Sequence, residues 1–168
     1  MLKWAIGLAL AATVMGCSAP AQVAPAANAT ATPIPATATP PELNVQSVVA
    51  HFKAAGLPLG NVVELTAEND PNKLLGRPKQ YVAKAFWVDA RLGAAPANVT
   101  MDAGGSVELF GATEDMAARK AYIEAIAAAP LFAEYTYGRG RVLIRLPKAM
   151  TPGQAQDYEK ALNSLKGA

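Results

Sequence analysis

Charge divides this 168-residue chain into two unlike parts. Every charged residue except Lys3 lies at or beyond Glu42, and the uncharged residues 18–41 consist mainly of Ala, Thr and Pro. Such a stretch has no periodic apolar face to bury, so it cannot repay the conformational entropy lost on folding. We therefore expect residues 18–41 to form an extended tether, and residues 42–168 to form a single folded domain.

The first 17 residues, MLKWAIGLALAATVMGC, have the organisation of a bacterial export signal. Lys3 supplies a positive charge, and Trp4 to Met15 is an uncharged apolar run. That run is shorter than the roughly 20 residues needed to span a bilayer, but it suits the apolar core of a signal peptide. The residues Val14-Met15-Gly16-Cys17 resemble a lipobox, in which small residues precede the cysteine that becomes the mature N-terminus.

This resemblance implies that the Cys17 sulfur is lipidated and that the signal peptide, residues 1–16, is removed. Residues 17–41 then form the acylated cysteine and its tether, and the protein is held at the cell membrane on the extracytoplasmic side. The alternative is an ordinary secretory signal, cleaved near Ala19 or Ala21. Lipidation is favoured because the single Cys falls where a lipobox requires it, and because an unpaired thiol is a liability in an oxidising compartment.

Composition excludes several classes of protein. One Cys rules out an internal disulfide framework, and one Cys with one His leaves too few ligands for a typical zinc site. A formal net charge of +2 shows no basic excess of the kind carried by nucleic-acid-binding proteins. We therefore expect no metal, no cofactor and no nucleic-acid partner, and we expect attachment to a membrane only through the lipid.

Residues 42–168 alternate between helical and extended patterns. The pattern predicts three helices: one over 45–55 capped by Asn44, one from Thr113 to Pro130, and a final one that begins with a capping box at Thr151 and Gln154. It also predicts four strands, over 81–89, over 107–110 and two within 132–146. The order α-β-β-α-β-β-α predicts an α+β fold: one antiparallel sheet of about four strands, with about three helices on one face.

Residues 66–80 form a polar loop with two turn signals. Its oxygen-rich segment Glu68-Asn69-Asp70-Pro71-Asn72 resembles a calcium loop only in composition, since the alternating acidic spacing of such loops is missing. We expect its Asp and Asn side chains to bond their own backbone as Asx-turns. Because this loop has more functional groups than a connector needs, we predict that it contacts a ligand or partner. We expect this contact to be made by Asp70, Asn72, Gly76, Arg77 and Tyr81.

The same region carries a second resemblance. The residues Asn69-Asp70-Pro71-Asn72, Leu74-Leu75-Gly76-Arg77-Pro78, Gln80-Tyr81 and Lys84 are similar to a pattern that recurs in uncharacterised bacterial lipoproteins. The similarity covers about residues 45–165 and supports both the domain boundaries and the compartment. It implies no activity and no functional residues.

Candidate catalytic groups are few. His51 is the only imidazole, and it lies at the border of the apolar face formed by Val45, Val48 and Phe52. No Ser lies in a nucleophile-elbow context. Within the helix that follows Thr113, Arg119 falls in an otherwise apolar stripe, where we expect it to pair with Asp115 or to lie at the core edge.

These patterns favour a membrane-anchored extracytoplasmic lipoprotein of unknown activity, with a non-enzymatic domain that binds something or supports the envelope. The alternative is a small envelope hydrolase with an unrecognised site. Whether its partner is a protein or a small molecule stays open.

Overall fold

The computed structural model describes residues 42–93 and 96–168, and all of them belong to one compact unit. The predicted signal peptide, Cys17 and the tether lie outside the described residues. None of the described helices is long and apolar enough to cross a membrane.

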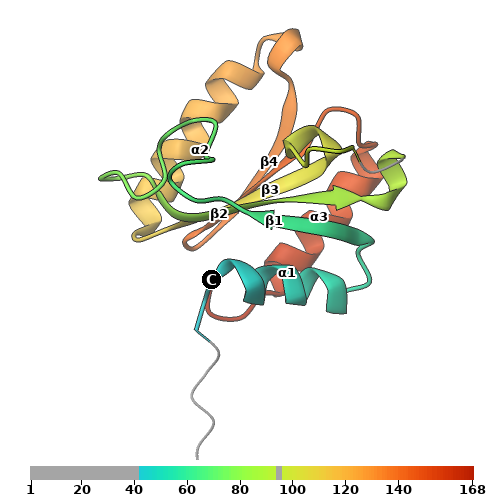
Figure 1. The fold of residues 1–168 in the computed structure, drawn as a ribbon, viewed down its shortest axis with the longest axis horizontal. Coiled ribbons are helices and arrows are strands. Elements are labelled where there is room, and N and C mark those ends of the chain that lie inside the picture. The colour runs from blue at the N-terminus through green and yellow to red at the C-terminus, as the bar shows by residue number, and fades with distance from the viewer. Residues whose placement is uncertain (1–41, 94–95) are drawn as a thin grey trace, which may run out of the picture. The chain divides into compact units, whose positions relative to one another are not determined.

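The centre of the domain is one antiparallel sheet in the order β1-β2-β3-β5-β4 (Figure 1). Its strands are β1 (Leu59–Glu64), β2 (Tyr81–Asp89), β3 (Gly104–Phe110), β4 (Glu134–Arg139) and β5 (Val142–Pro147). The predicted α+β class with one antiparallel sheet and three helices is therefore confirmed. The sheet has one strand more than expected, because β1 adds to the edge beside β2.

Two helices cover one face of the sheet. Helix α1 (Val45–Ala54) and helix α3 (Pro152–Ser164) pack together over alternate residues of β2, β3 and β5. Their contact is almost wholly apolar, with Phe52 of α1 and Trp87 of β2 completely buried. An edge-to-face contact joins these two rings, whose centroids are 6.0 Å apart, and α3 adds Tyr158 at 5.7 Å from Phe52.

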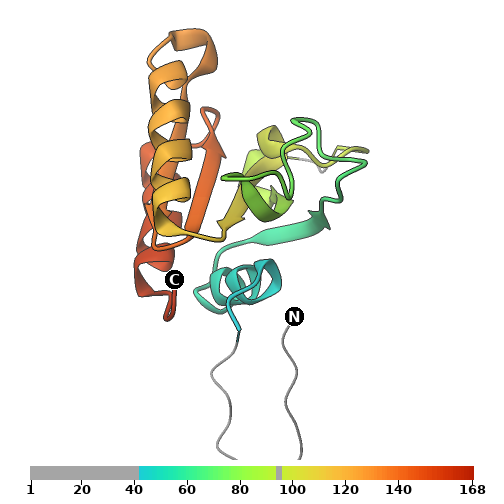
Figure 2. The same cartoon turned by 90° about the vertical axis from the view of Figure 1, so that its left-hand side faces the viewer.

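The third helix, α2 (Thr113–Ala127), lies on the opposite face, as Figures 1 and 2 show. Our expectation that all helices share one face was wrong. The apolar stripe of α2 is weak, and only Met116 and Ile123 are buried along it. Met116 packs with Leu143, Phe110 and Tyr81 into a small second core on this side of the sheet.

Predicted capping signals correspond to real helix starts. Asn44 and Ser47 form a reciprocal capping box at α1, and Thr151 and Gln154 form another at α3. Each box satisfies two backbone N–H groups that would otherwise lack partners at a helix start. Helix α2 has no side-chain cap at Ala112, but two acidic residues in its first turn favour its dipole.

Asp70 organises the loop between β1 and β2. Its buried carboxylate accepts hydrogen bonds from the backbone N–H groups of Asn72, Leu74 and Leu75, at 3.2, 2.8 and 3.1 Å. The bond from Asn72 closes the predicted Asx-turn. The Tyr81 hydroxyl donates to the same carboxylate at 2.7 Å, which attaches the loop to the start of β2.

A second buried carboxylate, Asp89, joins β2 to α3. Its Oδ2 accepts from the Tyr158 hydroxyl at 2.7 Å, and both of its oxygens accept from the Arg91 guanidinium at 2.7–3.2 Å. Burial alone would raise the pKa of Asp89, but the hydrogen bonds from Arg91 and Tyr158 hold it below the ordinary Asp value. Burial and the neighbouring Asp89 carboxylate raise the pKa of Tyr158.

Candidate functional site

The sheet face beneath α2 carries a cluster of buried charges. Lys84 of β2 and Glu108 of β3 lie directly opposite each other in the strand register, and both are almost completely buried. The Lys84 ammonium donates to Glu108 at 2.9 Å and lies 4.7 Å from the centre of the Tyr81 ring. A buried charge is tolerated only when it is paired, so these two residues depend on one another.

Two arginines complete this cluster, which we call the charged floor: Lys84, Glu108, Glu134, Arg119 and Arg145. Arg119 of α2 donates to Glu108 at 3.3 Å, and Arg145 of β5 lies 3.5 Å from the same carboxylate. Arg145 also makes a bidentate contact with Glu134 of β4, with both bonds at 2.7 Å. Three cations and two carboxylates leave the charged floor with one excess positive charge.

Of the two positions expected for Arg119, pairing with Asp115 is wrong, whereas a position at the edge of the core is confirmed. Arg119 points toward the sheet and pairs with Glu108, with only a tenth of its side chain exposed. The helical spacing placed Arg119 correctly in the inward-facing stripe. Its partner could not be read from the helix, because Glu108 belongs to a strand.

A buried hydroxyl on this face has no hydrogen-bond partner among the described residues. The Ser106 hydroxyl of β3 is buried and lacks a hydrogen bond within the described residues. Ser106 is paired in register with Arg145 and lies two residues from Glu108, so it sits beside the charged floor. An unpaired buried hydroxyl costs free energy, since it gives up its hydrogen bonds to water.

Two surface recesses lie along α2. Recess A has a volume of about 550 Å³ and lies at the C-terminal end of the helix, where Ile126, Leu131, Phe132 and Pro147 form apolar walls and Arg145 reaches it from the charged floor. Recess B has a volume of about 480 Å³ and is lined by Leu74, Lys79, Gln80, Asp115, Ala118, Arg119 and Tyr122. The helix residues Asp115, Arg119, Tyr122 and Ile126 are spaced i, i+4, i+7 and i+11, so both recesses follow one side of α2.

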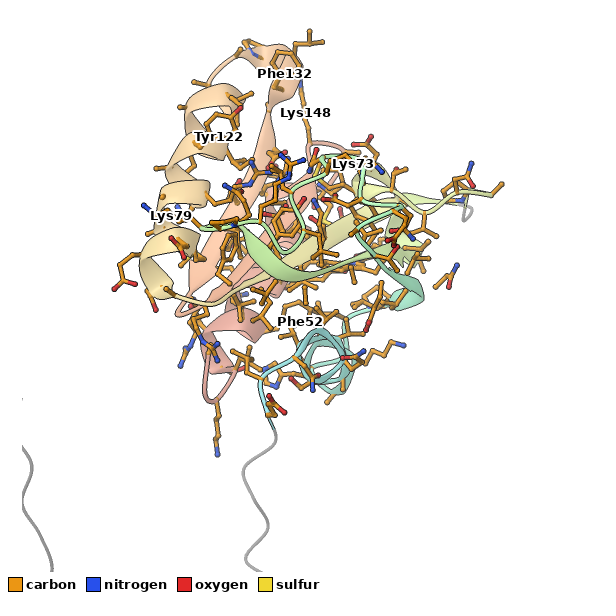
Figure 3. All side chains as sticks on the ribbon, turned by 60° about the vertical axis from the view of Figure 1, so that its left-hand side comes forward. Phe52, Lys73, Lys79, Tyr122, Phe132 and Lys148 are labelled. Carbon is orange, nitrogen blue, oxygen red and sulfur yellow. The ribbon has the colours of Figure 1, made fainter. Side chains whose placement is uncertain are left out.

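Most of the exposed large hydrophobic side chains gather at these recesses. Of the five in the described residues, Ile126, Leu131 and Phe132 line recess A and Tyr122 lines recess B. Leu131 is 85% exposed, Tyr122 58% and Phe132 57%. Figure 3 shows Tyr122 on α2 and Phe132 just beyond the end of that helix. Val82 is the fifth such residue and lines neither recess.

The loop residues predicted to contact a partner divide into two groups. Asp70 and Tyr81 are completely buried and bond to each other, so their side chains hold the loop in shape. Asn72, Gly76 and Arg77 are exposed on the loop surface. The loop residues that line recess B are instead Leu74, Lys79 and Gln80.

The hydrogen bonds of Asp70 also set its acidity. Burial alone would raise the pKa of this carboxyl, but donation by the Tyr81 hydroxyl and by three backbone N–H groups lowers it below the ordinary Asp value. For Tyr81, burial and the Asp70 carboxylate both raise the pKa of the phenol. Asp70 is therefore ionised and Tyr81 neutral at neutral pH.

The structure brings His51 next to a serine. The Nε2 atom of His51 lies 3.0 Å from the Ser164 hydroxyl and 2.9 Å from the backbone oxygen of Ala161. Since a carbonyl oxygen can only accept, Nε2 carries the proton, and the Ser164 hydroxyl donates to the same oxygen at 2.8 Å. In this arrangement the imidazole cannot take a proton from the serine, and no Asp or Glu of the described residues lines the adjoining recess.

Two large aromatic residues of the sheet have structural positions. Trp87 and Phe110 are completely buried, and they lie in the cores on opposite faces of the sheet. No group of three or more His, Cys, Asp or Glu side chains within residues 42–93 and 96–168 is placed to hold a metal ion.

Sequence reasoning overlooked the charged floor. Lys84 and Glu108 each interrupt a strand that is otherwise rich in apolar residues, and that interruption was the available signal. Two such charges on neighbouring antiparallel strands, of opposite sign and on the same face, are expected to pair. The sequence could not supply the strand register that places them opposite one another.

Comparison with known proteins adds no relative. No family model matches the chain, and neither the curated proteins nor the solved structures include one that matches it.

Proposed function

We propose that this protein is a membrane-anchored extracytoplasmic lipoprotein whose domain binds a ligand or partner on the α2 side of the sheet. One observation carries the binding assignment: four of the five exposed large hydrophobic side chains in the described residues line the two recesses along α2. Single exposed hydrophobic residues are ordinary, but a gathering of them beside a recess is typical of a binding surface.

The charged floor supports this assignment in two ways. Its ion pairs fix Arg145 and Arg119 where they reach recess A and recess B, so a ligand meets side chains that are already ordered. Its carboxylates are also fully engaged: Glu108 contacts three cations and Glu134 a bidentate arginine. Because both carboxylates are already paired with cations, they are not free to contact a substrate, which favours binding over catalysis.

The anchor rests on the lipobox resemblance at Cys17, and labelling tests it directly. Cells that express the full chain are grown with radiolabelled palmitate, beside cells that express Cys17→Ser. The wild-type chain is expected to carry label and to accumulate as an uncleaved precursor in the presence of globomycin, whereas the variant carries none. An unlabelled wild-type chain would overturn the lipoprotein assignment.

The binding surface is tested by thermal denaturation of the full chain with fractionated envelope extract. A ligand present at about 100 times its Kd stabilises the fold by about 2.7 kcal/mol, which for a domain of this size raises Tm by about 10 °C. Phe132→Ser is expected to abolish this increase, and Val82→Ser is the matched control because Val82 is equally exposed but lies outside both recesses. Equal losses in the two variants would place the binding surface elsewhere.

A further inference from the structure

Recess B differs from recess A in the chemistry of its lining. Eight of the twelve residues that line recess A are apolar, whereas four of the seven that line recess B carry hydrogen-bonding groups and one more, Tyr122, is an exposed aromatic residue. Lys79 and Arg119 are donors, Asp115 is an acceptor, and Gln80 is both. Such a mixed lining selects a ligand by hydrogen bonding as well as by shape.

Gln80 supplies the most specific observation. Its amide oxygen Oε1 is buried and accepts no hydrogen bond from the described residues, although the side chain lines recess B. A buried acceptor without a partner costs free energy, which a ligand that donates a hydrogen bond would recover. A ligand with a donor, such as a hydroxyl or an amide N–H, would satisfy this oxygen.

The lining disfavours two simpler classes of ligand. A phosphate or carboxylate would be attracted by Lys79 and Arg119, but it offers only acceptors, so it cannot donate a hydrogen bond to the Gln80 oxygen or to the Asp115 carboxylate. A simple cation would be repelled by Lys79 and by Arg119. Lys79 and Asp115 form no ion pair within the described residues, so both are available to hydrogen-bond a neutral ligand.

Tyr122 provides the apolar contact. Its ring is 58% exposed where it lines recess B, and the Arg119 guanidinium lies 5.6 Å from the ring centre, which helps to hold the ring in place. The face of an aromatic ring is electron-rich and attracts the weakly positive C–H groups of a flat ring laid against it. A pyranose sugar has such C–H groups on its faces and hydroxyls around its edge.

From this lining we infer that recess B binds a hydroxyl-rich saccharide, with one sugar ring packed on Tyr122 and a sugar hydroxyl or acetamido N–H donating to Gln80. Lys79 and Asp115 hydrogen-bond the remaining hydroxyls, and Leu74 and Ala118 contact the apolar parts of the sugar. This inference rests on the proposed binding function and names the ligand class for one of its two recesses.

The test is a titration of the full chain, labelled with ¹⁵N and purified in detergent, followed by NMR. The probes are the N-acetylglucosamine tetramer, maltotetraose and inorganic phosphate. With at least one saccharide we expect saturable shifts at the backbone of residues 79, 80 and 122 and at the side-chain amide of Gln80. Shifts with phosphate alone, or with none of the three probes, would overturn the inference.

Three variants distinguish ligand contact from a general structural effect. Tyr122→Ala is expected to weaken saccharide binding about tenfold, whereas Tyr122→Phe, which keeps the ring, retains affinity within about threefold. Gln80→Leu should also weaken binding, because it removes the acceptor. Val82→Ala, outside the recess, is the control. Unchanged affinity in both Tyr122→Ala and Gln80→Leu would contradict the assigned contacts.

A negative result for the saccharide inference can be separated from a negative result for the proposed binding function. If no saccharide binds but an envelope fraction still raises Tm in a manner lost in Phe132→Ser, the α2 side remains a binding surface and only the saccharide assignment falls. If no probe and no envelope fraction has any effect, both the saccharide inference and the proposed binding function are wrong.

Discussion

The two faces of the sheet are built from different chemistry, although the same strands form both. On the face beneath α1 and α3, β2, β3 and β5 present alternate apolar residues that a dense aromatic and aliphatic core covers completely. On the face beneath α2, the intervening residues include Lys84, Glu108 and Arg145. The alternation of side chains along a strand allows one sheet to carry both kinds of surface.

In our proposal, this difference between the two faces separates stability from binding. The face beneath α1 and α3 buries its large hydrophobic side chains, which is the main source of folding free energy. The α2 face leaves Tyr122, Leu131 and Phe132 exposed beside two recesses and orders its charges by ion pairs. Exposed hydrophobic groups and desolvated charges add little to stability, which fits a surface that serves recognition.

The largest effect is expected from breaking the charged floor. Glu108→Ala removes the carboxylate shared by Lys84, Arg119 and Arg145 and leaves a buried ammonium without a partner. We expect a loss of about 3–5 kcal/mol in the free energy of unfolding, measured by urea denaturation.

The control for that change removes both charges. In Lys84→Met with Glu108→Leu no unpaired ammonium remains, although Arg119 still loses its partner, so part of the lost stability should return, because buried ion pairs are often replaceable by apolar residues of similar volume. A double variant no more stable than Glu108→Ala would show that the charged floor holds the fold by more than its pairing.

An equally large loss of stability is expected from one substitution on the apolar face, where no second substitution compensates for it. Phe52→Ala leaves a cavity between Trp87 and Tyr158, and we expect a loss of about 3–5 kcal/mol in the free energy of unfolding. Phe52→Leu fills most of that space and should cost about 1–1.5 kcal/mol. If the two substitutions cost the same, aromatic packing rather than volume would be the decisive property at this position.

A smaller, pH-dependent effect on the free energy of unfolding is expected at Asp89, a buried charge at the edge of the apolar face. Folding lowers its pKa, so its contribution is present above the unfolded-state value of about 3.9 and is lost as pH falls through the lower folded-state value. At pH 7 we expect Asp89→Asn to cost about 1–3 kcal/mol through weaker bonds from Arg91 and Tyr158.

The measurement is urea denaturation of both chains from pH 7 to pH 2. The difference in unfolding free energy between wild type and Asp89→Asn should stay constant down to about pH 5 and narrow below about pH 4. A constant difference down to pH 2 would contradict the lowered pKa of Asp89.

The smallest effect is expected at Ser106. Its hydroxyl is buried beside the charged floor without a partner, so Ser106→Ala should leave stability unchanged or raise it by up to about 1 kcal/mol. Ser47→Ala is the contrasting substitution, because Ser47 takes part in the capping box of α1 and its loss should lower stability by roughly 0.5–1 kcal/mol. A loss above about 1 kcal/mol in Ser106→Ala would reveal a partner for this hydroxyl.

Features that depend on neighbouring residues were predicted well from the sequence. The Asn44 cap of α1 and the capping box of α3 lie where expected, and so do the Asx-turn at Asp70, the strand at 81–89 and the hairpin of β4 and β5. Each depends on residues a few positions apart, whose geometry local backbone preferences set.

Strand β1 was missed for a local reason as well. Its sequence, LGNVVE, has Gly60 and Asn61 as its second and third residues, which are more typical of a turn, and its pairing with β2 is irregular between Leu59 and Val62. An edge strand pairs on one side only, so its sequence is less constrained and its signal is weaker.

The chain by itself determined the division at Glu42, the antiparallel α+β class and the starts of α1 and α3, because these follow from composition, periodicity and short-range hydrogen bonding. Only the tertiary structure decided that α2 lies opposite the other helices, that Glu108 faces Lys84 and Arg119, and that Gln80 meets Tyr122 at one recess. The physical reason is that strand register and helix docking join residues far apart in the chain, through contacts that no local pattern encodes.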